Sequence, residues 1–194
     1  MEAAEFFIKK GHDPNFRARP GCLTPLQMAT GKTKAEEFLE KYAPEVDIGD
    51  DIKGTLLHSA CADSSPRAVE LLLAKARSSR ANMCEYVNKG CTKYSTPLYA
   101  AAYRGNIEIM QILLDAGADI NKCDGGRLGT PLDAACALER VDAVKFLLSK
   151  GAKIQTTKMT GPELCDGVKA SSKLEEIRNV LNSGGLSQDG LESG

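Results

Sequence analysis

The chain has 194 residues, of which 42% are hydrophobic and 26% charged, and its formal net charge is -1. Such a composition is typical of a water-soluble chain of about one domain that can bury a continuous core. The near-zero charge argues against a nucleic-acid binder that relies on bulk electrostatics. No stretch approaches the roughly 18 apolar residues of a membrane helix, and residues 1–5 are acidic where a signal peptide is basic. We therefore expect an intracellular protein without membrane insertion, in the cytoplasm or the nucleus.

The seven cysteines indicate neither a disulfide scaffold nor a metal centre. Their number is odd and their spacing irregular, which fits a reducing compartment. Cys84 and Cys91 have no second close pair beside them and lie further apart than the usual zinc ligands, which are separated by about two to four residues. We expect no metal and no cofactor.

The N-terminal segment has the pattern of a helix without its partner helix. Residues 6–11 match residues 146–151 of a later and more complete copy, so residues 1–15 are predicted to form half of a helix pair. A first, shortened pair is predicted from Thr24 to Tyr42. The acidic stretch at 43–54 is predicted to be the hairpin that leads to the next pair.

The second pair is predicted to begin at Thr55, and an insertion follows it. Thr55 and the corresponding Thr96 are separated by more than the usual spacing, and the extra residues lie within 75–95. Residues 82–88 are expected either to extend the preceding helix or to form a longer finger. Segments longer than a repeat requires are often functional, and here a binding role and a neutral insertion remain equal alternatives.

The third and fourth pairs are the best formed. Thr96 can cap a helix, Pro97 suits its first position, and Gly105 can end it in the left-handed conformation. The same triplet starts again at Thr130. Residues 160–182 are predicted to form a degenerate C-terminal cap with an amphipathic last helix, and residues 183–194, rich in glycine and serine, to form a flexible tail.

Thr96–Asn121 resembles the ankyrin repeat. The shared features are Thr-Pro-Leu, a run of alanines, a helix ending in Leu-Leu, and a Gly-Ala-Asp turn followed by asparagine, at a period of about 33 residues. The segment departs from the pattern at Tyr99, which stands where the family has histidine. The resemblance implies an all-α solenoid of antiparallel helix pairs with hairpin fingers, forming a single domain over residues 1–182.

The resemblance also implies a function. Ankyrin arrays are non-catalytic modules that bind another protein through the concave face and the fingers, as adaptors, scaffolds or inhibitors. We expect a monomer that binds a protein partner. The alternative is a targeting or regulatory segment of a larger enzyme or channel, and the half pair at 1–15 favours it.

Three features that resemble catalytic or ligand sites are better explained by the repeat. Residues 31–33, Gly-Lys-Thr, lack the glycine and the strand that precede a phosphate-binding loop. His58 occupies the repeat slot that Gln27, Tyr99 and Asp133 also hold, where the resemblance implies a bracing hydrogen bond. Cys61 and Cys136 share the slot of Ala102 and are expected to pack as small apolar residues. We therefore expect no enzymatic activity.

The remaining candidate for function is the concave surface. The slots that face it carry tyrosine and arginine, the residue types that dominate binding hot spots. The predicted partner-binding residues are Asp51, Lys53, Lys93, Tyr94, Tyr103, Arg104, Arg127, Leu138 and Arg140.

Overall fold

The computed structural model describes residues 6, 9–11, 24, 54–79, 82–92, 95–123, 129–153 and 172–185. The predicted half pair at 1–15 and the predicted first pair at 24–42 lie outside these residues except at isolated positions. The predicted helix start at Thr160 lies outside them as well.

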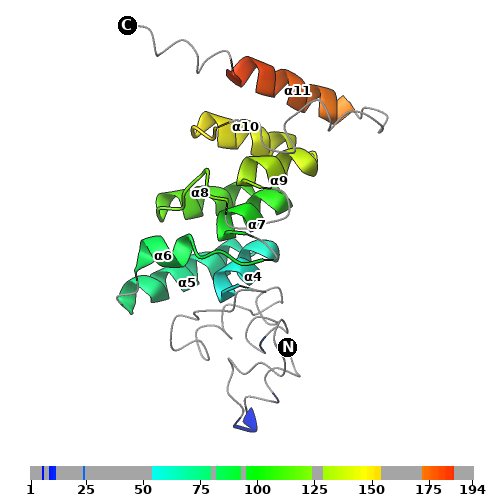
Figure 1. Cartoon of the computed structure of the whole chain (residues 1–194). Coiled ribbons are helices and arrows are strands. Elements are labelled where there is room, and N and C mark those ends of the chain that lie inside the picture. The colour runs from blue at the N-terminus through cyan, green and yellow to red at the C-terminus, as the bar shows by residue number, and fades with distance from the viewer. Residues whose placement is uncertain are drawn as a thin grey trace, which may run out of the picture.

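Three antiparallel helix pairs stack on one another in the described region, as Figure 1 shows. They are α4 (Leu56–Ala62) with α5 (Pro66–Ser78), α7 (Pro97–Arg104) with α8 (Ile107–Asp115), and α9 (Pro131–Ala137) with α10 (Val141–Ser149). The first helices of the pairs form one column and the second helices form the other. The predicted all-α repeat array is confirmed.

The first helix of each pair starts at a threonine. The side chain of Thr96 accepts a hydrogen bond from the backbone N–H of Tyr99 at 3.2 Å, and Thr130 accepts one from Asp133 at 3.3 Å. Asp133 returns the interaction, because its carboxylate accepts from the backbone N–H of Thr130 at 2.8 Å. These reciprocal bonds satisfy N–H groups that a helix start leaves without an intrahelical partner.

The residue before the threonine at the start of each first helix, which is Thr55, Thr96 or Thr130, has a positive φ. It is Gly54 (+77°) in the second repeat, Ser95 (+54°) in the third and Gly129 (+92°) in the fourth. A Cβ at Gly54 would lie 2.6 Å from the ring of His58, and one at Gly129 would lie 2.5 Å from the carboxylate of Asp133. Glycine is therefore needed where the bracing side chain folds back over the turn. In the third repeat that side chain is Tyr99, whose ring stacks on Tyr103 instead, which leaves room for Ser95.

Small residues let the first helices pack closely. Ala60, Ala101 and Ala135 occupy equivalent slots and are completely buried, between larger buried side chains such as Leu98 and Leu132. The second helices contribute aliphatic residues, including Val69, Met110 and Val144 in equivalent slots. The core is thus continuous along the array, as expected for repeats that cannot bury their apolar faces alone.

The insertion folds as a separate short helix, α6 (Met83–Val87), and matches neither alternative expected from the sequence. Asn82 caps it by accepting a hydrogen bond from the N–H of Glu85 at 3.3 Å. α6 packs against α5, with Tyr86 and Val87 buried. Leu73 on α5 is only 2% exposed, whereas the equivalent Leu114 and Leu148 are half-buried. The insertion therefore adds core to the second repeat.

A final helix, α11 (Ser172–Gly185), lies across α10 at the end of the array (Figure 1). Ile177 is its buried residue at 2% exposure, and Val180 and Leu181 pack against the core beside it. Lys145 on α10 forms an ion pair with Glu176 on α11 at 2.5 Å. This agrees with the amphipathic helix expected there, although the helix includes residues 183–185, which the sequence pattern places in the tail.

Candidate functional site

His58 is a buried bracing residue between the second and third repeats. Its Nδ1 accepts from the backbone N–H of Thr55 at 3.1 Å and lies 3.0 Å from the Thr55 hydroxyl. Since Nδ1 faces two donors, the neutral ring carries its proton on Nε2, which donates to the carbonyl of Ser95 at 3.3 Å. Burial lowers the pKa of His58 to about 4. A side chain with both nitrogens occupied and no exposed surface has no access to a substrate, so its role is structural.

Two asparagines in equivalent slots join each finger to the next repeat. Asn88 Oδ1 accepts from the N–H of Asp119 at 2.7 Å, and its Nδ2 donates to the carbonyl of Gly117 at 3.0 Å. Asn121 makes the corresponding bond one repeat later, accepting from the N–H of Lys153 at 2.8 Å. Asn88 therefore holds the chain after the insertion in the same position relative to the next repeat as Asn121 does one repeat later.

Asn88→Ala is expected to destabilise the protein by about 2 kcal/mol, because it removes the side-chain hydrogen bonds of Asn88 to Cys84, Gly117 and Asp119. Asn121→Ala is the matched control, since Asn121 is less buried and the structure shows one such bond for it. The measurement is chemical denaturation of both variants. Equal losses would contradict the role given to Asn88.

Cys61 and Cys136 are buried thiols in one repeat slot, as predicted. Burial raises the pKa of the Cys61 thiol, and burial together with the charge of Asp133 raises that of Cys136 to about 12. Neither thiol is available as a thiolate at neutral pH. All five cysteines among the described residues are free, and these residues contain no group of three or more metal-ligating side chains.

Cys61→Ala and Cys136→Ala are each expected to cost about 1 kcal/mol or less, because alanine already fills the slot in the third repeat and little volume is lost. Urea unfolding of the two variants tests this. A cost of several kcal/mol for either variant would require a bonded or liganded cysteine.

The described members of the predicted binding set, Tyr103, Arg104, Leu138 and Arg140, lie along the joints between paired helices. Together with Asp63, which lies at the joint between α4 and α5, we call them the joint row. Asp63, Arg104 and Arg140 are exposed, whereas Tyr103 and Leu138 are half-buried. Asp63 is not among the residues predicted from the sequence, but it holds the same repeat slot as Arg104 and Leu138. The joint row thus gathers acidic, basic, aromatic and aliphatic side chains at one edge of the array.

Tyr103 and Arg140 also contribute to the structure of the joint. The Tyr103 ring stacks on Tyr99 with 6.4 Å between ring centroids. The Nε of Arg140 donates to the carbonyl of Tyr103 at 3.4 Å, and its side chain lies over Gly105, where a Cβ would meet it at 3.0 Å. The Arg104 side chain makes no hydrogen bond or ring contact of this kind among the described residues. The other predicted residues, Asp51, Lys53, Lys93, Tyr94 and Arg127, lie outside the described part of the chain.

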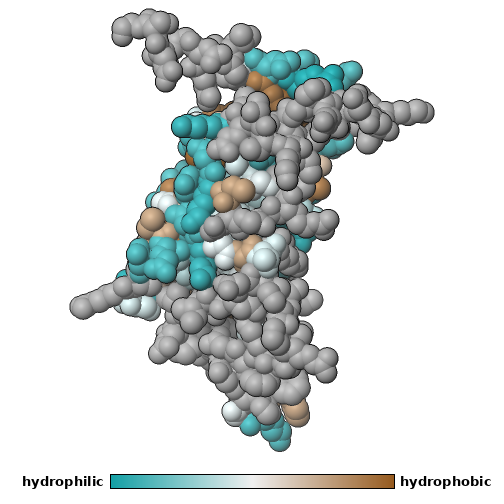
Figure 2. Space-filling model, viewed as in Figure 1, coloured by the Kyte–Doolittle hydropathy of each residue, from teal (hydrophilic) through white to brown (hydrophobic). Residues whose placement is uncertain are grey.

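A second surface feature, which the sequence did not reveal, is a groove of about 810 Å³ beside α6. One wall comes from α6 and the residues after it, and the other from the turn after α8. Its lining residues are Asn82, Cys84, Glu85, Asn88, Lys89, Gly90, Cys91, Thr92, Gly117, Asp119 and Lys122. On the face drawn in Figure 2, the described residues along the edge that holds α6 and α8 are mainly hydrophilic.

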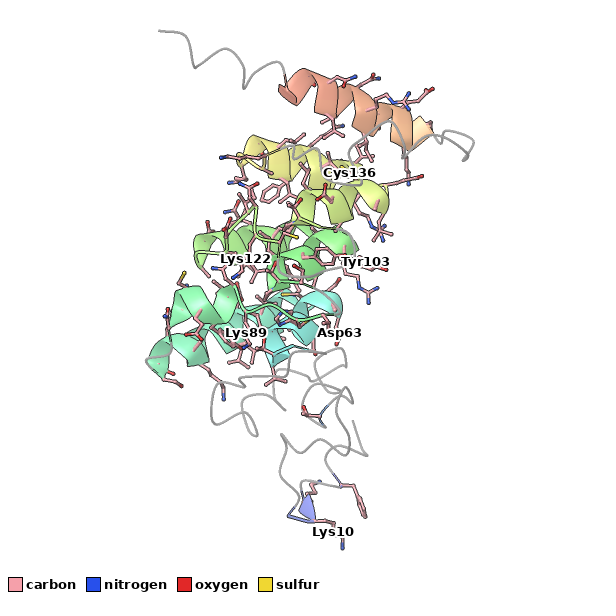
Figure 3. The ribbon with its side chains drawn as sticks, in the orientation of Figure 1. Lys10, Asp63, Lys89, Tyr103, Lys122 and Cys136 are labelled. Atoms are coloured by element: carbon pink, nitrogen blue, oxygen red, sulfur yellow. The ribbon has the colours of Figure 1, made fainter. Side chains whose placement is uncertain are left out.

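The groove and the joint row lie on different sides of the array. Figure 3 shows Asp63 and Tyr103 at one side and Lys89 and Lys122 toward the other. The two features could therefore hold different segments of a partner at the same time.

Comparison with known proteins decides the family. A family model for ankyrin repeats in three copies matches residues 76–158. This region belongs to the ankyrin-repeat family. Ankyrin repeats are protein-interaction modules and are generally non-catalytic. No helix among the described residues of this ankyrin array has the length and apolar character needed to cross a membrane.

Several curated proteins are similar to parts of the array. BRCA1-associated RING domain protein 1 of Caenorhabditis elegans is 37% identical over 42% of this chain and 12% of its own length. Transient receptor potential cation channel subfamily A member 1 of Homo sapiens is 27% identical over 79% of this chain and 14% of its own. Ankyrin repeat and SOCS box protein 11 of Mus musculus is 38% identical over 45% of this chain and 26% of its own length. The matched region is therefore a minor part of each of these relatives.

Proposed function

We propose that this ankyrin array binds a partner protein through the joint row, as an adaptor, scaffold or inhibitor. The observation that supports the proposal is Arg104, an exposed guanidinium whose neighbour Tyr103 is only half-buried. The core of the third repeat is complete without either side chain, because the alanines of α7 and the aliphatic residues of α8 fill it. Arginine and tyrosine are both enriched at binding hot spots.

The double variant Tyr103→Ala with Arg104→Ala is expected to weaken partner capture by about tenfold or more, since each hot-spot residue accounts for about 2 kcal/mol. Loss of the Tyr99 stack should cost the fold only about 1 kcal/mol. The measurement is quantitative affinity capture from native lysate, at a temperature where circular dichroism shows wild type and variant equally folded.

The matched control is Glu70→Ala with Arg77→Ala, two exposed residues that lie further along α5, beyond its first turn from the joint. This control should capture the partner as well as wild type does. Unchanged capture by the folded joint-row variant would show that the binding face lies elsewhere.

A second candidate function is a targeting or regulatory segment of a larger protein. The match to a cation channel over 79% of this chain supports it, because the matched region is only 14% of that relative. Sequencing the full transcript tests this candidate. A reading frame that closes at both ends of the present chain without further domains would contradict it.

A further inference from the structure

We infer that the groove beside α6 is a second binding site, which takes an extended peptide segment of a partner protein carrying both an acidic and a basic side chain. The site is separate from the joint row, and the inference does not require that the joint row binds anything. Its volume of about 810 Å³ falls within the usual range for ligand sites.

The backbone at the base of the groove offers a free edge for pairing. Cys91 and Ser95 form an antiparallel bridge in which each N–H donates to the other's carbonyl, at 2.7 and 2.8 Å. In such a pair the neighbouring residue turns its own N–H and C=O to the opposite edge. That neighbour is Gly90, which lines the groove and makes no hydrogen bond among the described residues. An added strand satisfies such an edge, and this is a common mode of peptide recognition.

The absence of side chains at two lining positions lets another backbone approach. Gly90 and Gly117 stand on opposite parts of the groove, and a Cβ built at Gly117 would meet nothing within 4 Å. The amide of Asn88 is already engaged, because its Nδ2 donates to the carbonyls of Cys84 and Gly117 and its Oδ1 accepts from the N–H of Asp119. The hydrogen bonds of Asn88 therefore fix the spacing between the two walls of the groove, and the space between the walls stays open.

The charges of the two walls indicate what the segment carries. The α6 wall has Glu85 and Lys89, and the facing wall has Asp119 and Lys122. Successive side chains of an extended peptide point to opposite sides, so one would face each wall. Each wall offers both signs of charge, which favours a mixed-charge segment over a purely acidic or purely basic one. Among the described residues no aromatic side chain lines the groove, so these residues offer no stacking platform for a nucleic-acid base.

The test uses short synthetic peptides and the full chain labelled for amide NMR. The first peptide is extended and threonine-rich, with one glutamate and one lysine at adjacent positions, so that one side chain faces each wall. The second has the same sequence with N-methyl groups on alternate amides, and the third has lysine in place of glutamate. We expect the first peptide to shift the amides of Gly90 and Gly117 and to bind about tenfold or more tightly than the other two, a difference of about 1.4 kcal/mol.

Variants separate this site from the joint row. Lys89→Glu should weaken binding of the first peptide and restore binding of the lysine-substituted one, whereas Lys153→Ala, an exposed lysine outside the groove, should change neither. The joint-row double variant should bind the peptide as wild type does. Equal binding of the N-methylated peptide, absence of shifts at Gly90 and Gly117, or loss of binding in the joint-row variant would each overturn the inference.

Discussion

Gly54→Ala is expected to lower the free energy of unfolding by about 3 kcal/mol. An alanine held at a positive φ costs about 1–2 kcal/mol. At Gly54 the new methyl group would also lie 2.6 Å from the His58 ring, which is completely buried and bonded on both nitrogens. Forcing that ring aside adds an overpacking cost of about 1–3 kcal/mol. Thermal and urea unfolding of the variant measure the sum.

Gly117→Ala is the matched control for Gly54→Ala. Gly117 has a positive φ of 92°, similar to the 77° of Gly54, but a Cβ there would have nothing within 4 Å. Its substitution should therefore cost only the backbone term, about 1 kcal/mol. If both variants lose the same stability, His58 does not hold the turn in the way described above.

Acid is expected to destabilise the protein through His58 by about 3 kcal/mol. The pKa of His58 is about 4 in the folded protein, because burial disfavours the charged ring, and about 6.5 in an unfolded chain. Between these values the unfolded chain binds more protons than the folded one. The contribution of neutral His58 to the free energy of unfolding is therefore complete above pH 6.5 and is lost as the pH falls toward 4. Protonation would also place a hydrogen on Nδ1 facing the N–H of Thr55.

The measurement is the free energy of unfolding of wild type and His58→Gln at several pH values from 7 to 4. Glutamine is a suitable replacement because Gln27 holds the same slot in the first copy of the repeat. The carboxylates titrate in both proteins, so the difference between them isolates the histidine. A difference that stays constant with pH would contradict the expected protonation.

Much of the fold could be predicted from local pattern. The threonine caps, Pro97 and Gly105 act through hydrogen bonds and φ angles within three or four residues, so the starts of α7 and α9 follow from the sequence alone. The buried alanine slots follow from comparison of one repeat with the next. The packing role of Cys61 and Cys136 could be predicted in the same way, because a repeated slot has a repeated environment.

Less of the candidate site could be predicted from the sequence in this way. The sequence placed Tyr103 and Arg104 at a joint, but it did not reveal that Tyr103 stacks on Tyr99 or that Arg140 lies over Gly105. It also left residues 82–88 as a helix extension or a finger, whereas they form α6. Asn88 does stand in the slot of Asn121, and this spacing is the signal that would have shown where the insertion returns to register.

The sequence by itself determined the three described helix pairs, their order and the repeat family, because these depend on short-range capping and on a periodic apolar pattern. Only the tertiary structure showed that the insertion forms α6 and that a groove lies beside it. Those depend on contacts between residues about thirty positions apart, such as Asn88 with Asp119. Bonds of this kind form only after neighbouring repeats have stacked, so no local pattern encodes them.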